Sequence, residues 1–350
     1  MLKTKVWGLL GSLWLGAPLR AQSAAGSDSA GRFTLRVDAA RHAVILRAGP
    51  FRLERAAGSD PGGGMHEHTW AAAPARFTWP VDGWVRGMKL RVLDGDGRPL
   101  PRGLVRHLVV INLGRGQLFY PQAERLMAMT AEAEDLRLPA TIGIPVSATM
   151  PMMMLIAWKN VTADPIPSAT AEVIVQMTSP QMVPRPISVF PVPLSVINPV
   201  GHAGDFDLPA GPTRWTADFD LPLSGRILAA GGHLHDHGTG FELQEITPDA
   251  SRTILRLRTK LSPEGRLLAV DRVLPGAAGD GLELRQGRRY RLVATYLNPT
   301  GNTLAKGAMA NLILLFSPDR AEAWPALPAS HPDYRKDLAY LESFARKSSP

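Results

Sequence analysis

Three histidines at alternate positions are the residues of this sequence best suited to chemistry. His233, His235 and His237 lie between two short apolar runs, at 226–230 and 241–243. In an extended chain the side chains repeat with a period of two, so these imidazoles would project from one face. Imidazoles on one strand face are a common way to hold a copper or zinc ion. The alternative is a polar loop with histidines in water, but the flanking runs favour a metal site.

Two other segments contain residue types that bind metals. His66 and His68 form a second His-x-His after the glycine-rich stretch 58–64, which is typical of a loop, so metal binding and a plain loop both stay open. The methionines at 150–154 are soft donors, but successive residues of a strand point to opposite faces. We therefore expect the methionine cluster to pack in the core.

Composition favours an all-β protein. The chain has 350 residues, 45% of them hydrophobic and 20% charged, with 33 glycines and 31 prolines that indicate many turns. The formal net charge of +8 comes mostly from scattered arginines. Because no Lys/Arg block is interleaved with aromatic residues, we expect no nucleic-acid partner.

The N-terminal segment predicts export. Lys3 and Lys5 precede an apolar stretch at 6–16 and then small residues, so 1–25 reads as a signal peptide rather than a membrane anchor. No later segment is long and apolar enough for a transmembrane helix, so we do not expect an integral membrane protein. The chain has no cysteine, which suits a bacterial periplasmic or secreted protein without disulfides.

The rest of the chain divides into two similar halves. We expect a first β-sandwich at 26–178, a proline-rich linker at 179–205, a second, metal-binding sandwich at 206–318 and a tail at 319–350 with a helix at 333–347. Segment 122–136 has the most helical composition of the first half. The runs 155–160 and 292–298 resemble each other, and each precedes a turn and a final strand. A duplicated jelly-roll-like sandwich explains this spacing.

The sequence resembles the copper type II, ascorbate-dependent monooxygenases, the peptidylglycine α-hydroxylating and dopamine β-type enzymes. The resemblance covers roughly 77–316 and is carried by His233-Leu234-His235, by 307–312 and by 81–89 with 105–109. It implies two tandem jelly-roll domains. It also implies a second-domain copper held by His233, His235 and Met309, with O₂ and ascorbate or another external reductant.

The first copper site of that family is incomplete in this sequence. The resemblance implies three histidines there, but the adjacent pair reads Arg106-His107 and the later position is Trp158. We therefore expect one copper rather than two. His237 and His107 remain candidate additional ligands, and Asp236 could orient a ligand.

Two hypotheses follow. The first is a secreted copper monooxygenase that hydroxylates a C–H bond of an unidentified small molecule or peptide. The second is a non-catalytic periplasmic module that binds copper or a substrate. Zinc, or no metal at all, is a third reading of the same motif.

Overall fold

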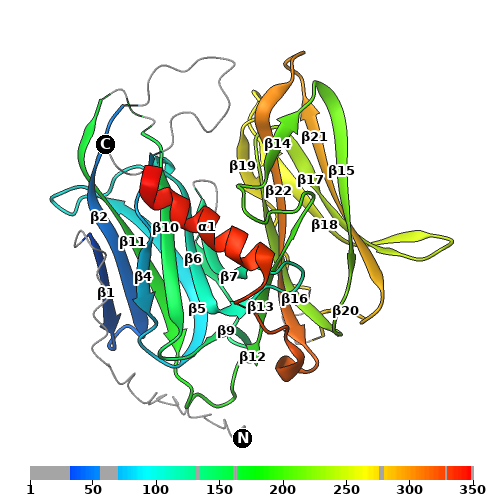
Figure 1. Ribbon diagram of the computed structural model, residues 1–350, viewed down its shortest axis with the longest axis horizontal. Coiled ribbons are helices and arrows are strands. Elements are labelled where there is room, and N and C mark those ends of the chain that lie inside the picture. The colour runs from blue at the N-terminus through cyan, green and yellow to red at the C-terminus, as the bar shows by residue number, and fades with distance from the viewer. Residues whose placement is uncertain are drawn as a thin grey trace, which may run out of the picture.

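The protein is an all-β chain of two tandem jelly-roll-like antiparallel sandwiches. The computed structural model describes residues 32–55, 70–130, 135–160, 162, 164–275, 280–327 and 329–347. The expected signal peptide, His66 and His68 lie outside these ranges. Figure 1 shows the two sandwiches side by side, with the C-terminal helix crossing one side of the first.

The first sandwich consists of two sheets. One sheet has the order β1-β2-β11-β5-β9-β12, with β8 beside β5, and only its β9–β12 pair is parallel among the described strands. Its strands are β1 (Phe33–Asp38), β2 (Ala43–Leu53), β5 (Gly83–Leu93), β8 (Leu136–Arg137), β9 (Ile142–Val146), β11 (Ile166–Thr178) and β12 (Ile187–Ser188). The opposite sheet has the order β3-β10-β6-β7, with β4 beside β10. Its strands are β3 (Trp70–Ala71), β4 (Ala75–Thr78), β6 (Val105–Gly116), β7 (Ala123–Thr130) and β10 (Pro151–Trp158).

The second sandwich also has two sheets. The sheet nearer the first sandwich (Figure 1) has the order β13-β22-β16-β20, with β14 beside β22. Its strands are β13 (Phe190–Ser195), β14 (Asp205–Leu208), β16 (Gly225–Leu234), β20 (Leu282–Leu284) and β22 (Leu304–Pro318). The outer sheet has the order β15-β21-β17-β18-β19. Its strands are β15 (Gly211–Asp220), β17 (Gly238–Ile246), β18 (Ser251–Leu261), β19 (Leu267–Val270) and β21 (Arg289–Asn298).

Alternating apolar residues explain why these segments form strands. In β5, Met88, Leu90 and Val92 are buried in the first core, whereas Lys89 and Arg91 between them are exposed. Such alternation lets a strand bury one face and leave the other in water. Each sandwich accordingly has its own hydrophobic core.

Two segments differ from the sequence expectation. The helix expected within 122–136 is wrong: Ala123–Thr130 is β7. Met127 and Met129 alternate into the first core, a bulge brings Leu126 to the same core, and Arg125 faces the other way. The proline-rich stretch 179–205 also contributes β12 and β13 to the sandwiches. Pro191 and Pro193 fit in β13 because it is an edge strand, where a missing backbone N–H costs no ladder bond on the outer side.

One turn is built the same way in both halves. Asn160 Oδ1 accepts from the N–H and the hydroxyl of Thr162, at 2.9 and 2.6 Å. Asn298 Oδ1 accepts from the same two groups of Thr300, at 3.1 and 2.7 Å. The amide nitrogen of each asparagine donates to two or more backbone carbonyls. Buried asparagines that satisfy a turn from within explain the similarity of the two sequence segments.

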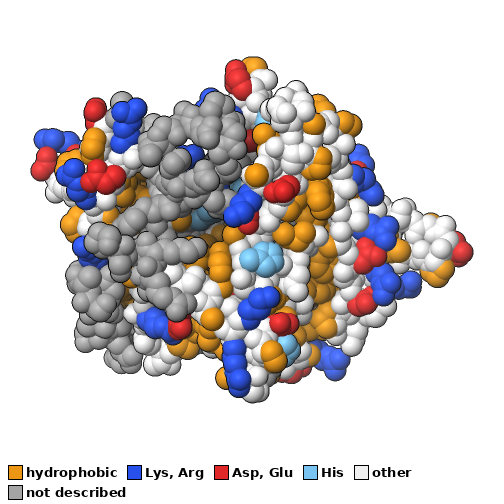
Figure 2. All heavy atoms as spheres, turned by 45° about the horizontal axis from the view of Figure 1, so that its top comes forward, with side chains coloured by type: hydrophobic (Ala, Val, Ile, Leu, Met, Phe, Trp, Pro, Cys, Tyr) orange, Lys and Arg blue, Asp and Glu red, His pale blue; other side chains and the backbone are white. Residues whose placement is uncertain are grey.

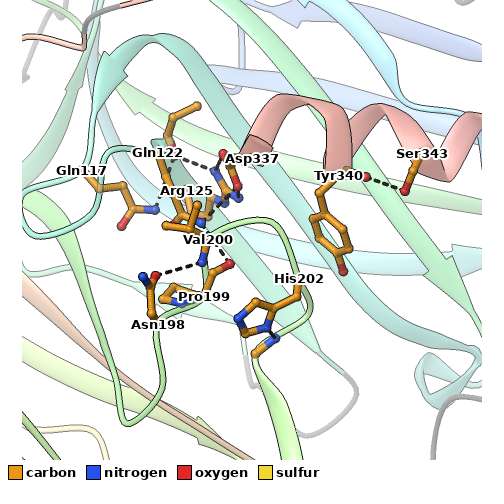
Figure 3. A network of polar contacts seen from close by, with 12 residues as sticks. Gln117, Gln122, Arg125, Asn198, Pro199, Val200, His202, Asp337, Tyr340 and Ser343 are labelled. Carbon is orange, nitrogen blue, oxygen red and sulfur yellow. Dashed lines mark hydrogen bonds and ion pairs between the residues drawn. The ribbon is translucent and has the colours of Figure 1, made fainter. Parts of the chain in front are cut away.

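Helix α1 (Pro332–Lys347) covers the outward side of the β3-β10-β6-β7 sheet, close to the expected 333–347. Its fully buried Asp337 accepts two hydrogen bonds from Arg125 of β7, at 2.6 and 2.8 Å, and one from Gln122 at 3.0 Å (Figure 3). Gln122 also donates to the carbonyl of Pro199. The network therefore fastens the tail to the first sandwich and to the segment that leads into the second. No helix in the described ranges is long and apolar enough to cross a membrane.

The loop between β6 and β7 connects the two sandwiches. Its Leu118 belongs to the second hydrophobic core, and the Phe119 ring lies 5.2 Å from that of Phe219. The Tyr120 hydroxyl accepts a 3.0 Å hydrogen bond from the backbone of Ser195. The end of β6 is thus anchored in the second sandwich, which determines where the start of β6 lies.

Candidate metal centre

Three histidines from two domains come together between the sandwiches. His107 lies on β6 of the first sandwich, and His233 and His235 belong to β16 and the turn after it in the second. One ring nitrogen from each histidine lies within 4.8 Å of the others. The His107 and His233 rings are 5.5 Å apart and the His233 and His235 rings 5.4 Å, both nearly perpendicular.

A bulge in β6 turns His107 outward. In a regular strand, Val105 and His107 would face the same side. The pairing with β10 shifts between Trp158, opposite Val105, and Ala157, opposite His107. Val105 and Leu108 are therefore both in the first core, and His107 points away from it.

A second bulge does the same for β16. The pairing with β22 shifts between Ile227 and Ala229, which adds Leu228 to the strand. After this bulge Ala230 and Leu234 face the second core, while Ala229 packs against the first core. His233 is an odd number of positions from Ala230 and Leu234, so it faces the first sandwich.

Met309 is next to His235 in the sheet. The backbone N–H of His235 donates to the Met309 carbonyl at 3.2 Å, directly beyond the pair that Leu234 makes with Ala310. Opposed residues of antiparallel strands project from the same face. The sheet therefore presents Met309, which is 6% exposed, on the side where the histidines gather.

His237 does not join the three histidines, contrary to the sequence expectation that all three alternate positions share a face. Strand β16 ends at Leu234, and His237 adopts a left-handed φ of 65° within a turn. Its Nδ1 packs against Gly265, where an added Cβ would come within 2.2 Å. Asp236 accepts a 2.8 Å hydrogen bond from the Leu267 backbone, so its carboxylate holds β19 in place.

Trp158 is a core residue. It is 1% exposed, and its ring lies 5.9 Å from that of Phe51. Because Trp158 lies on the core side of β10, this position offers no metal-binding side chain to the histidines. Met152 and Met154 likewise pack in the first core, as expected, and Met153 faces the C-terminal helix.

Burial differs among the three histidines. His235 is 4% exposed, whereas His107 and His233 are only partly buried. A small molecule would therefore approach from the side of His107 and His233.

A buried tyrosine lies close to His235. The fully buried hydroxyl of Tyr296 donates to the Met309 carbonyl at 2.6 Å. Burial raises the pKa of this hydroxyl well above its usual range, and the backbone bonds with Met309 and His235 offset only part of that rise.

The donor set fits a metal ion that prefers nitrogen. Metal–imidazole bonds are about 2.0–2.1 Å long, so two nitrogens on one ion are at most about 4 Å apart. Nitrogens up to 4.8 Å apart therefore need only a small movement of the partly exposed rings to bind one ion together. Three neutral imidazoles suit copper or zinc, and a thioether beside them suits copper.

Positive and negative side chains are mixed on the face of the molecule that Figure 2 shows. On the face shown in Figure 2, Lys and Arg side chains are interleaved with Asp and Glu among the described residues. The net charge of +8 is thus not gathered into one basic patch on that face.

No family model and no curated protein matches this chain. Among solved structures, a chain of Sulfolobus Turreted Icosahedral Virus has a TM-score of 0.35 and 11% identity over 81% of this chain and 97% of its own. The STIV MCP structure has a TM-score of 0.34 and 11% identity over 71% and 94%. PNGF-II has a TM-score of 0.36 and 10% identity over 78% and 66%. Likenesses this distant carry no argument about function.

Proposed function

We propose that this protein binds one copper ion between its two sandwiches, with His107, His233 and His235 as ligands and Met309 as a fourth, softer donor. The observation that supports this proposal is the approach of three imidazole nitrogens to within 4.8 Å of one another. His107 comes from a different domain than the other two, so the cluster is not a by-product of a local sequence repeat.

Met309 is the reason for preferring copper to zinc. Three imidazoles alone suit either ion, but a thioether is a poor ligand for zinc and a good one for Cu(I). Met309 is adjacent to His235 in register, and its side chain leaves the same face of the sheet. The resemblance to copper type II monooxygenases supports the same choice of ion.

For the activity, we favour an O₂-dependent hydroxylase that is exported by its N-terminal segment. Hydroxylation converts R–H, O₂, two electrons and two protons into R–OH and water, and ascorbate or another external reductant would supply the electrons. Bound copper would supply the one-electron chemistry that O₂ requires. The chain's own residues would hold the ion, with His235 fixed in the interior and the His107 side open to a small-molecule or peptide substrate.

A non-catalytic copper-binding module is the second candidate. It is favoured by the position of His107, since the one remaining ligand of the expected electron-transfer site belongs to the same cluster as His233 and His235. Among the described residues no second cluster of at least three His, Cys, Asp or Glu side chains meets the same distance limit. A single site is also what storage or transfer of copper would require.

The test separates these readings in two steps. Metal-free protein is given copper or zinc, and bound metal is counted for the wild type and for a His233→Ala, His235→Ala variant. We expect one copper per chain in the wild type and none in the variant; preferential zinc binding, or no metal, would refute the copper proposal. Oxygen uptake with ascorbate and a panel of small peptides and amines then decides between hydroxylase and binding module.

A further inference from the structure

Tyr296 connects the outer sheet of the second sandwich to the backbone beside the histidines. It lies on β21, is 2% exposed, and crosses the core to reach β22. Its hydroxyl donates to the Met309 carbonyl oxygen at 2.6 Å. That carbonyl oxygen also accepts a hydrogen bond from the backbone N–H of His235 at 3.2 Å. One carbonyl therefore receives a side-chain donor and the backbone of a candidate ligand.

The position of this carbonyl gives the hydrogen bond its importance. His235 follows the last residue of β16, and the chain turns at once, with the Gly238 N–H donating to the His235 carbonyl at 3.2 Å. The bond from His235 to Met309 is thus the final rung of the β16–β22 ladder. Terminal rungs open more readily than central ones because fewer neighbours support them.

Strand β21 supports the far side of the same turn. Tyr296 is paired with Gly238, and the Leu297 N–H donates to the His237 carbonyl at 2.9 Å. The backbone of β21 thus holds the end of the turn, and the Tyr296 side chain holds its beginning.

We propose that Tyr296 is a positioning residue of the metal centre, which acts through the Met309 carbonyl to fix the backbone of His235 and Met309. This inference rests on the proposed copper site. It assigns the rigid part of that site to the backbone of His235 and Met309 and the adjustable part to the partly buried rings of His107 and His233. Partners that orient metal ligands without touching the ion typically matter by about 10–100-fold in affinity.

The experiment compares Tyr296→Phe with Tyr290→Phe. Both tyrosines are buried on β21, and both hydroxyls bond to backbone, since Tyr290 accepts from the Arg285 N–H at 3.0 Å. Copper affinity is measured by competition with a chelator, and the Cu(II) spectrum by electron paramagnetic resonance. We expect Tyr296→Phe to bind copper about 10–100-fold more weakly with altered hyperfine splitting, and Tyr290→Phe to match the wild type.

Equal affinity and an unchanged spectrum in Tyr296→Phe would overturn the positioning role, as would an equal loss in Tyr290→Phe. If Tyr296→Phe does not fold, 3-fluorotyrosine at position 296 alters the strength of the donor while keeping the ring. An altered copper spectrum in that protein supports the proposal, and an unchanged one overturns it. A wild type that binds no copper would instead refute the proposed function itself.

Discussion

At the scale of single residues, His237 and His107 exchange the roles that their sequence positions favour. His237 belongs to the alternating motif but sits in a left-handed turn against Gly265. His107 is far away in sequence and yet lies within ligand distance of His233 and His235. Proximity in the chain therefore misidentifies the third imidazole.

This exchange gives a prediction about affinity. Loss of a residue that orients a ligand typically lowers metal affinity by about 10–100-fold, and loss of a direct ligand should lower it further. We expect His107→Ala to weaken copper binding by more than about 100-fold and His237→Ala to leave it within about threefold of the wild type. Chelator competition measures both, and the reverse order would show that His237, rather than His107, binds the ion.

The sequence could predict part of the site and not the rest. His233 and His235 were recognisable from a two-residue spacing between strand-like runs, and Met309 from a family resemblance. His107 was a candidate additional ligand, but its place beside His233 and His235 depends on the bulge at Arg106 and on how two domains pack, and neither has a local sequence signature. Tyr296 was not recognisable at all, because a buried tyrosine in a strand has the pattern of an ordinary core residue.

At the scale of elements, β16 needs a small residue on its core face and the correct residue alternation between its two faces. Gly232 faces the second core, where an added Cβ would lie 2.6 Å from the Phe241 ring and 3.1 Å from the Asn311 carbonyl. Gly231 faces the other way, and its nearest neighbour would be 3.7 Å distant. The two adjacent glycines therefore differ in what they tolerate.

We expect Gly232→Ala to destabilise the fold by about 1–3 kcal/mol, the usual cost of overpacking a core. Gly231→Ala should change stability by less than about 0.5 kcal/mol because the added methyl meets only ordinary contacts. Urea unfolding of both variants measures the difference. Equal effects would mean that Phe241 does not pack on Gly232.

Helix α1 offers a second comparison of matched changes. Asp337 is fully buried with Arg125 and Gln122, whereas Glu342 on the same helix pairs with Arg76 at the surface, each side chain about half exposed. We expect Asp337→Ala to cost about 3 kcal/mol, the low end for breaking a buried pair, because Arg125 is 22% exposed. Glu342→Ala should cost less than about 1 kcal/mol. Chemical denaturation of both variants tests this, and similar losses would contradict the role assigned to the buried network.

The fold class could be predicted from composition and alternation, but several element types could not. Segment 122–136 has helix-forming residues, yet its neighbours β6 and the core make β7 the better solution. The prolines of 179–205 suggested a linker, and β13 shows that an edge position accommodates them. In both cases tertiary pairing overrides local preference.

At the scale of the whole molecule, the two sandwiches meet at both ends of β6, in addition to the packing of Ala229 against the first core. The loop after Gly116 inserts into the second core, and His107 near the start of β6 faces His233 and His235, about 30 Å away along an extended strand. A metal ion at the histidines would therefore tie the end that the loop does not reach.

This arrangement predicts that copper stabilises the contact between domains. At a hundredfold excess over Kd, binding should add about 2.7 kcal/mol to the free energy of unfolding. We also expect slower hydrogen exchange at 105–109 when copper is bound, with β1 unchanged. In His107→Ala, adding copper should no longer slow hydrogen exchange at 105–109. Protection that persists in that variant would contradict an inter-domain site.

The most direct test of the account is the ligand environment of copper in the reconstituted full-length protein. Metal analysis combined with X-ray absorption spectroscopy counts the ions per chain and the imidazoles around each. We predict one copper per chain with three imidazoles, falling to two in His107→Ala. Two coppers per chain, or an unchanged imidazole count in His107→Ala, would contradict a single site shared between the two domains.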